Sequence, residues 1–290
     1  MKLRISRVIA GGVLALGLSG VAAAGPAEDA QVSNDASTQF ELGLSYDNGL
    51  GVRRDYAMAL WWYSKAAKQG FAAAQNNLGV MYERGRGVPQ DYALAAAWFR
   101  KAAEQGVASA EFNLGLMYDA GKGVLRDPVQ AALWYRKAAG HGQLAARYNL
   151  GVMSEKGDGV PQDYAQALVW YREAAVQGNA DAQGALGLMY DRGEGVPQDF
   201  AQALTWYRKA ASRGNAAAQY NLGLMYAKGN GVPKDYVRAH MWFNLAASRF
   251  SAADAAGREK AMRNRDLAAS KMTPVQIAEA QRLARDWVPK

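Results

Sequence analysis

The sequence predicts an all-α fold, namely an α/α superhelical solenoid of six helix-turn-helix repeats with a C-terminal helical cap. Three observations predict it. The sequence resembles itself at every shift of 36 residues, apolar residues within each copy follow helical spacing, and glycine-rich turns recur at fixed positions. Because two short helices cannot bury their own apolar face, the copies are expected to stack on their neighbours.

The amino-terminal segment, residues 1–24, is typical of a secretory signal peptide. A basic start, an apolar run and a small-residue cleavage site follow one another at Lys2, Arg4 and Arg7, then residues 8–18, then residues 22–24. We therefore expect export through the Sec pathway to a bacterial periplasm, with an uncleaved anchor as the alternative. Residues 25–36 are small and polar, which predicts a flexible leader. No later stretch is apolar over the roughly 20 residues that a membrane span needs.

Six repeats follow without a gap. They cover residues 37–72, 73–108, 109–144, 145–180, 181–216 and 217–252. One position is always tryptophan, namely Trp62, Trp98, Trp134, Trp170, Trp206 and Trp242. A Leu-Gly pair also aligns, with its glycine at Gly43, Gly79, Gly115, Gly151, Gly187 and Gly223. Both positions are predicted to be structural, because small residues leave room for large ones in a packed array.

The second copy shows how one repeat is built. Ala74, Leu78 and Tyr82 form one stripe of a first helix, which ends at Gly85 because glycine readily adopts the positive φ of a helix C-terminus. Asp91 is then expected to cap a second helix. The apolar face of that helix comprises Ala95, Trp98, Phe99, Ala102 and Ala103. The equivalent capping residues of the other copies are Asp55, Asp127, Asp163, Asp199 and Asp235.

Beyond the sixth copy the period fails, and residues 253–290 are predicted to form capping helices. Residues 254–270 have the pattern of one helix. A capping box at residues 273–276, with Pro274 at the first helical position, opens a last helix that runs through Arg285. Atypical ends of this kind cover the exposed face of a terminal repeat.

Composition excludes several classes of site. The chain has no cysteine, so it has no disulfide framework and no thiolate metal site. Its formal charge of +8 falls to +5 without the three cations of the predicted signal peptide. Such mild basicity does not indicate nucleic-acid binding. We expect no cofactor and no metal.

The repeat resembles a known family. Its pattern, A-x3-L-G-x2-Y-x2-G-x-G-V followed by D-Y-x2-A-x2-W-Y/F-x-K-A-A, is similar to the Sel-1-like repeat, a relative of the tetratricopeptide repeat. Residues 37–252 carry it, and residues 272–287 are similar to the tail of many bacterial members. The resemblance implies an adaptor: bacterial members act as scaffolds, as regulators of envelope signalling or polysaccharide export, and in host contact. This chain departs from the cysteine-bridged members.

The resemblance to tetratricopeptide repeats also implies that the first helices line a concave groove. Amides there would clamp the backbone of a partner, methionines one turn later would give an adaptable apolar floor, and aromatic rings would add contact area. The residues are Asn77, Asn113, Asn149 and Asn221, then Met81, Met117, Met153, Met189 and Met225, then Phe112, Tyr148 and Tyr220. Repeat packing alone would produce the same spacing, so both interpretations stay open.

The sequence offers little for catalysis. His141 lies at a helix end, where a cation suits the helix dipole, and His240 is expected to be partly exposed beside Trp242. The capping aspartates belong to separate hairpins and form no carboxylate pair. A ladder of lysines on the second helices is expected to be solvated surface, at Lys101, Lys137 and Lys209.

The sequence therefore predicts an exported scaffold that is not an enzyme. It would bind other proteins or peptides in the concave groove and serve envelope signalling or assembly. Two alternatives stay open. One is direct binding of envelope glycan, such as peptidoglycan, by the aromatic ladder. The other is a β-lactamase-like hydrolase acting on cell-wall or β-lactam compounds, which only the resemblance to cysteine-rich relatives raises.

Overall fold

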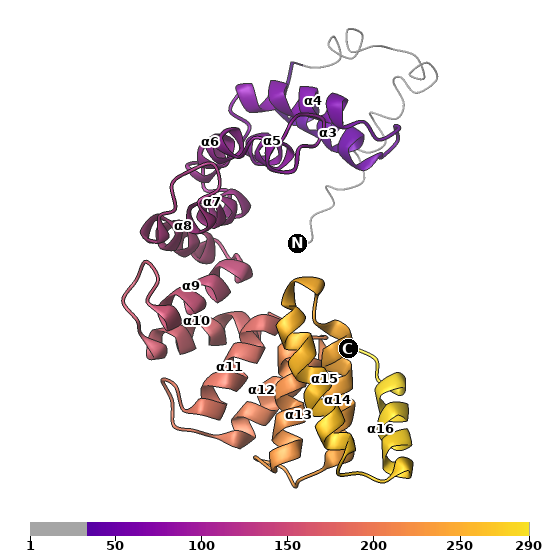
Figure 1. The fold of residues 1–290 in the computed structure, drawn as a ribbon. Helices are drawn as coiled ribbons and strands as arrows, with labels where there is room; N and C mark the ends of the chain where they lie inside the picture. Colours follow the sequence, from indigo (N-terminus) through magenta and orange to yellow (C-terminus); the bar gives the residue numbers. More distant parts are fainter. Residues whose placement is uncertain (1–33, 290) are drawn as a thin grey trace, which may run out of the picture. The chain divides into compact units, whose positions relative to one another are not determined.

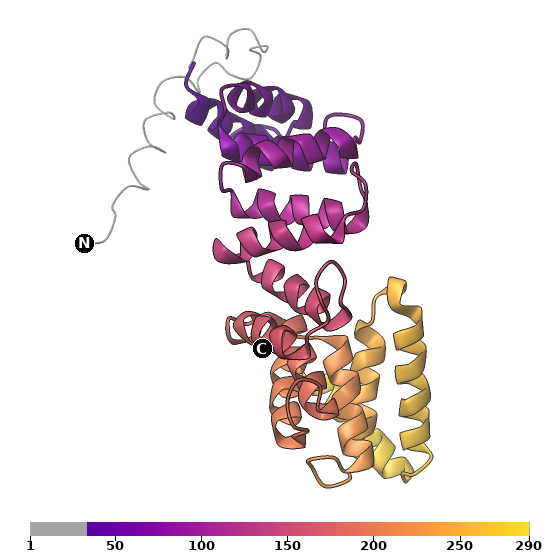
Figure 2. The same cartoon turned by 90° about the vertical axis from the view of Figure 1, so that its left-hand side faces the viewer.

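The computed structural model describes residues 34–289. The predicted signal peptide and residues 25–33 of the predicted leader lie outside this range. Every regular element of the described part is helical, with fourteen α-helices and one short 3-10 helix (Figures 1 and 2). The prediction of an all-α repeat fold is therefore confirmed.

The α-helices up to residue 249 form six hairpins, one in each repeat. We call the first helix of a hairpin helix A; these are α3 (Ala36–Asn48), α5 (Ala72–Arg84), α7 (Ala108–Ala120), α9 (Leu144–Lys156), α11 (Ala180–Arg192) and α13 (Ala216–Lys228). We call the second helix B; these are α4 (Tyr56–Lys68), α6 (Tyr92–Ala103), α8 (Pro128–Gly140), α10 (Tyr164–Val176), α12 (Phe200–Ser212) and α14 (Tyr236–Arg249).

The described chain divides into two compact units. Unit 1 holds residues up to 110 together with 122–124, and unit 2 holds residues 111–121 together with everything from 125 onward. Unit 1 thus contains the first and second hairpins. Unit 2 contains nearly all of the third hairpin, the fourth to sixth hairpins, and the C-terminal helices.

Asp35 precedes α3, and its carboxylate accepts a hydrogen bond from the backbone N–H of Thr38 at 2.8 Å. A side chain that accepts from this amide satisfies one of the free donors of the first helical turn. The last two residues of the predicted leader, Asp35 and Ala36, therefore belong to the first helix and its cap.

The ends of the helices lie where glycine and aspartate predict them. Helices A end at glycines in the left-handed conformation, for example Gly85 with φ +64°. Helices B begin after an aspartate whose carboxylate accepts a backbone N–H of the first turn, as Asp91 does from Leu94 at 2.9 Å. Pro128 occupies the first position of α8 behind the cap Asp127, so its missing N–H costs no helical hydrogen bond.

A close approach of two helices explains the glycine of the Leu-Gly pair. On α5, a Cβ atom added at Gly79 would lie 2.7 Å from the ring of Phe99 on α6. Gly115 faces Tyr135 in the same way, at 2.6 Å. Glycine is therefore what allows helix B to lay an aromatic ring directly on the backbone of helix A, as the sequence predicted.

The apolar cores lie at the junctions between successive repeats. One cluster in unit 2 joins Tyr171 and its alanine neighbours on α10 to Leu186 and Met189 on α11, and Trp206 of α12 packs against it. The same arrangement recurs one repeat later, with Tyr207, Leu222 and Trp242. Within each compact unit, successive hairpins thus bury their apolar faces on one another, as the small size of the hairpin predicted.

After the first repeat, the second glycine of the Gly-x-Gly-Val turns also contributes to these junctions. Gly87 lies against the backbone carbonyl of Tyr56, the first residue of the preceding helix B, and Gly159 lies against that of Pro128. Both have positive φ, +70° and +72°. The turn therefore needs glycine twice, once to end helix A and once to lie against the neighbouring repeat.

The C-terminal segment packs on the last hairpin. After a short 3-10 helix (Ala252–Asp254), α15 (Ala255–Ala269) and α16 (Pro274–Asp286) lie beside α14 (Figure 1). The predicted capping box is present, with Thr273 and Gln276 bonded reciprocally. Among residues 34–289, no helix is long and apolar enough to cross a membrane.

Candidate functional site

The asparagines of the predicted partner-binding stripe lie half-buried on helices A. Asn77 on α5 donates a hydrogen bond to the hydroxyl of Tyr63 on the preceding helix B. Asn149 does the same to Tyr135, and Asn221 to Tyr207. Asn113 is half-buried at the equivalent place on α7. Three of the four amides therefore join one repeat to the next.

Each of these tyrosines also bonds to a carboxylate of its own repeat. The hydroxyl of Tyr63 donates to Asp47 at 3.3 Å, that of Tyr135 to Asp119 at 3.5 Å. Tyr171 donates to Glu155 at 2.6 Å. We call this arrangement the carboxylate–tyrosine–asparagine link where the asparagine is present.

Burial raises the pKa of these tyrosines well above the ordinary value of a phenol, and the nearby carboxylates raise it further. The hydroxyls therefore stay protonated and act as donors. At the next junction, burial also raises the pKa of the Asp191 carboxyl, while its hydrogen bond from Tyr207 opposes this shift.

The methionines of the predicted stripe are core residues. Their exposed fractions lie between 1 and 4%, at Met81, Met117, Met153, Met189 and Met225. Met81 follows Ala74 and Leu78 at helical spacings of seven and three residues, which places it on the buried stripe of α5. The expectation of an adaptable methionine floor is therefore wrong, because these side chains already pack inside the repeats.

The aromatic residues of the stripe are half-buried and face helix B. Phe112 lies 5.7 Å from the ring of Tyr135, and Tyr148 lies 5.7 Å from that of Tyr171. Tyr220 contacts Phe243, and its hydroxyl accepts a hydrogen bond from Asn264 of α15 at 2.8 Å. Tyr220 is thus engaged by the C-terminal helices.

Aliphatic side chains take the place that the methionines were expected to fill. The residue three positions after each of the four asparagines is half-buried or exposed. Its side chain lies beside the asparagine amide on the helix surface. These residues are Val80, Leu116, Val152 and Leu224. Leu116 is 39% exposed. We call the members of both sets that lie in unit 2 the helix A stripe; they are Asn113, Asn149, Asn221, Leu116, Val152 and Leu224. Their 36-residue recurrence is the signal that sequence reasoning overlooked.

A second recurrent feature lies on helices B. The ammonium group of Lys101 lies 4.3 Å from the ring centre of Trp98, and that of Lys137 lies 4.1 Å from Trp134. Lys209 covers Trp206 in the same way. Trp98 and Trp206 are half-buried, whereas Trp62 and Trp134 are buried. The lysines are exposed, as predicted, but each one covers a tryptophan face.

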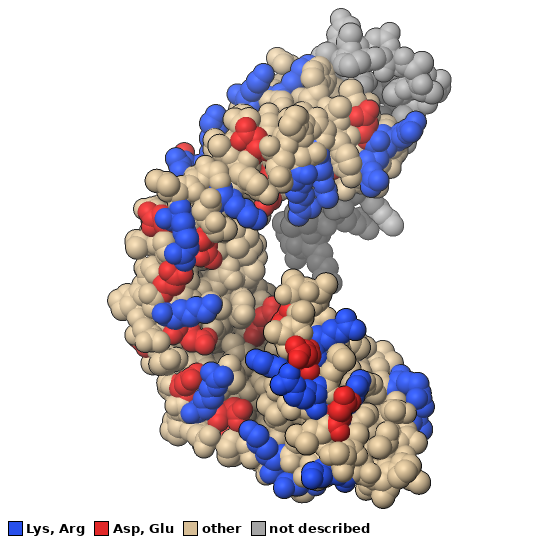
Figure 3. Space-filling model, viewed as in Figure 1, with Lys and Arg blue, Asp and Glu red and all other residues tan. Residues whose placement is uncertain are grey.

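The face drawn in Figure 3 carries no dominant patch of positive or of negative side chains. Lysine and arginine lie interspersed with aspartate and glutamate there. Among residues 34–289, no group of three or more His, Asp or Glu side chains is placed to hold a metal ion.

The two histidines have different surroundings. His141 is the C-cap of α8, and its Nδ1 lies 2.8 Å from a carboxylate oxygen of Glu111, whose side chain is buried. His240 is only 4% exposed and lies beneath α15 and α16. The expectation of a partly exposed His240 is therefore wrong, because the C-terminal helices cover this part of α14.

The repeats match a family model. The Sel1 repeat matches six segments, residues 36–71, 72–107, 108–143, 144–179, 180–215 and 216–249. Each segment begins at the first residue of a helix A. No curated protein matches the chain.

Solved structures show the same repeat. A Sel1 repeat protein from Oxalobacter formigenes is 38% identical, with 73% of this chain and 85% of that chain covered and a TM-score of 0.68. A protective antigen of uropathogenic Escherichia coli strains, which displays an SLR fold, is 32% identical. The match covers 88% of this chain and 68% of that chain, with a TM-score of 0.42.

Proposed function

The chain belongs to the Sel1 repeat family, whose members are generally protein–protein interaction scaffolds, and we propose that it is an exported scaffold that binds an extended protein segment on the helix A stripe. The observation that carries this proposal is the recurrence of one amide and one accessible aliphatic side chain on α7, α9 and α13; on α11, Ala185 takes the place of the amide. On each of these three helices the aliphatic residue follows the asparagine by three positions, so the stripe repeats one polar and one apolar contact for a partner.

Asn149 shows the hydrogen-bonding capacity that such an amide offers to a partner. An asparagine side chain has two N–H donors and a carbonyl oxygen with two lone pairs. The bond from Asn149 to Tyr135 uses one of these donors. The remaining donor and the carbonyl oxygen match the backbone C=O and N–H groups of an extended peptide. Because the carboxylate–tyrosine–asparagine link holds the amide in place, little side-chain freedom is lost on binding.

The aliphatic side chains supply the apolar part of the surface. Leu116 exposes more than a third of its surface beside Asn113 on α7, and Val152 lies beside Asn149 on α9. Covering such side chains contributes roughly 25 cal/mol for each Å² of apolar surface removed from water. The faces of Trp98 and Trp134 on helices B are less suited to stacking on a sugar, because lysine ammonium groups already cover them.

Site-specific photocrosslinking in cells tests the stripe. A photoreactive amino acid replaces Leu116 on helix A in one strain and Leu133 on helix B in the other; the two leucines are 39% and 44% exposed. We expect a protein adduct of defined mass from position 116 only. With the captured partner purified, Leu116→Asp should weaken binding about tenfold, because it buries a charge at an apolar contact, while Leu133→Asp should not. Equal adducts from both positions would contradict the proposal.

Export is tested separately by the mass of the mature chain. Fractionation of cells and intact-mass spectrometry should find a periplasmic form that begins at Gly25, because residues 1–24 have the three parts of a signal peptide. A cytoplasmic chain of full length would contradict export and leave the binding proposal to its own test.

A further inference from the structure

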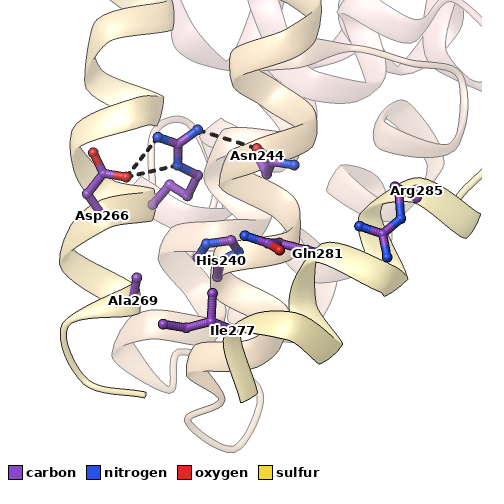
Figure 4. A pocket seen from close by; sticks show the side chains of 8 residues that line it. His240, Asn244, Asp266, Ala269, Ile277, Gln281 and Arg285 are labelled. Atoms are coloured by element: carbon purple, nitrogen blue, oxygen red, sulfur yellow. Dashed lines mark hydrogen bonds and ion pairs between the residues drawn. The ribbon is translucent and has the colours of Figure 1, made fainter. Parts of the chain in front are cut away.

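A pocket of about 480 Å³ lies between α14 and the C-terminal helices α15 and α16 (Figure 4). Its volume falls within the range of small-molecule sites. His240 and Asn244 come from α14, Arg265 and Asp266 from α15, and Arg285 from α16. We call it the cap pocket. It is formed entirely within unit 2, and no residue of the helix A stripe lines it.

His240 is a buried polar residue at a position that packing does not require to be polar. The other five repeats have leucine or alanine there, at Leu60, Ala96, Ala132, Leu168 and Leu204. The side chain is 4% exposed, and its Nδ1 is buried without a hydrogen-bond partner among the described residues. Burial lowers the pKa of His240, Arg265 lowers it further, and Asp266 opposes this. A neutral imidazole therefore faces the pocket, with one nitrogen to donate and one to accept.

The charges around the pocket leave one guanidinium uncompensated. Arg265 is paired with Asp266, with both contacts between 2.8 and 2.9 Å, and it reaches Asn244 at 3.5 Å. Arg285 takes part in none of the ion pairs found among residues 34–289. On the same helix, Arg282 is bonded to both Glu279 and Asp286. Figure 4 shows the Arg285 side chain at the edge of the pocket, on the side of Gln281.

The remaining wall is apolar and small. Ala269 of α15 and Ile277 of α16 line the end of the pocket below His240 in Figure 4. The pocket thus offers a cationic fork, an imidazole and an amide within reach of an apolar surface. A guanidinium fork matches a carboxylate in shape and charge.

We propose that the cap pocket binds a ligand with a single carboxylate and a small apolar group. The carboxylate pairs with Arg285, the imidazole of His240 and the amide of Gln281 bond to polar atoms next to it, and the apolar group lies against Ala269 and Ile277. A dianion such as phosphate fits less well, because Asp266 leaves the wall with a net charge of one. The carboxylate belongs either to a free small acid or to the C-terminus of a peptide.

The two histidines of the chain make the test specific. In protein labelled with ¹⁵N-histidine, the imidazole signals of His240 and His141 are assigned with the variants His240→Leu and His141→Gln. Propionate, N-acetyl-alanyl-alanine, the C-terminal amide of that dipeptide and inorganic phosphate are titrated in turn at constant pH. We expect the His240 signal to shift with at least one of the two carboxylates, and the His141 signal to stay in place. A shift with propionate indicates a free acid, and a shift with the dipeptide alone indicates a peptide terminus.

A matched pair of variants locates the carboxylate. Arg285→Gln and Arg282→Gln each remove one cation from α16, but only Arg285 lines the pocket. Arg285→Gln should weaken binding about tenfold or more, since it removes a charge-assisted hydrogen bond, and Arg282→Gln should leave it unchanged. The proposal is overturned if neither carboxylate shifts the His240 signal, if the amide or phosphate binds as well as the acid, or if both variants bind alike.

Discussion

Phe99 and Trp98 are neighbours on α6 but lie in different surroundings. Phe99 is fully buried against Gly79, whereas Trp98 is half-buried and has Lys101 over its ring. Phe99→Ala should therefore lower the free energy of unfolding by about 3–5 kcal/mol, the usual range for a buried phenylalanine. Trp98→Ala should cost clearly less, because part of its surface stays in water. Urea unfolding followed by circular dichroism measures both, and a larger loss for Trp98→Ala would contradict this assignment of the core.

Glu111 and His141 replace a pair of glutamines that joins the same two positions one repeat earlier. The same two positions hold Gln75 and Gln105 one repeat earlier, bonded at 2.7 Å. His141→Ala should cost about 1–3 kcal/mol, because it leaves the carboxylate of Glu111 buried without that partner. The double variant Glu111→Gln with His141→Gln should recover most of this loss. Urea unfolding of Glu111→Gln, His141→Gln and the double variant gives the coupling energy, and additive effects would show that the pair is not coupled.

His240 links stability to pH in a direction that its environment fixes. Its pKa is lowered in the folded state by burial and by Arg265, so the unfolded chain takes up a proton first as the pH falls. Its contribution to stability is complete above the unfolded pKa of about 6.5 and is lost below it. The urea midpoint of the natural chain should therefore fall more between pH 7.5 and pH 5.5 than that of His240→Leu. The reverse order would contradict a neutral buried imidazole.

The asparagine and methionine positions show how far sequence reasoning extends at this scale. Asn77 and Met81 are four residues apart, and Met81 is also three residues from Leu78, so helical spacing places Met81 beside both. Whether Met81 lies in the core with Leu78 or on the surface with Asn77 depends on how α4 and α6 pack against α5. The residue period along a single helix gives no information about that packing. The tyrosine hydroxyls that bind the asparagines come from another repeat and were missed for the same reason.

At the scale of helices, two glycines on α11 have opposite roles. A Cβ atom at Gly187 would collide with the ring of Tyr207, whereas one at Gly184 would lie 3.5 Å from its nearest neighbour, an oxygen of Asn215. Gly187→Ala should destabilise the protein by about 1–3 kcal/mol through overpacking. Gly184→Ala should stabilise it by about 0.5–1 kcal/mol, because alanine is the better helix former. Urea unfolding compares them, and the same sign for both would contradict the proposed contact.

The helices themselves follow closely from the sequence. Left-handed glycines and capping aspartates are local signals, so the amino end of each helix B and the carboxyl end of each helix A were predictable. The contact of Gly87 with the carbonyl of Tyr56 was not, because it joins segments that only the stacking of repeats brings together.

At the scale of the whole molecule, the last hairpin depends on the segment that covers it. Met241 and Leu245 of α14 are buried against Ala284 and Trp287. Deleting residues 253–290 should expose this surface, lower the urea midpoint and cause self-association, as expected for a repeat array without its cap. Light scattering after size-exclusion chromatography measures the association. A truncated chain that stays monomeric with an unchanged midpoint would show that α15 and α16 are not a cap.

The repeat number was readable from the sequence because every copy has the same length, whereas the cap pocket was not. Its walls come from three helices of which two lie outside the period, and His240 looked like an ordinary variation of a leucine position. A polar residue at a place where all other copies are apolar is the signal that would have marked it.

The second glycine of the turns also limits how genes for such chains can change in length. Gly87, Gly159, Gly195 and Gly231 each lie against the first residue of the helix B that precedes them, so these turns are held in register with the repeat before them. Removing one complete copy would bring another glycine to the same position against the preceding helix B. Losing a few residues within a copy would shift every later side chain away from its partner. Duplication or loss of entire copies is thus the route by which natural variants of this chain should become longer or shorter.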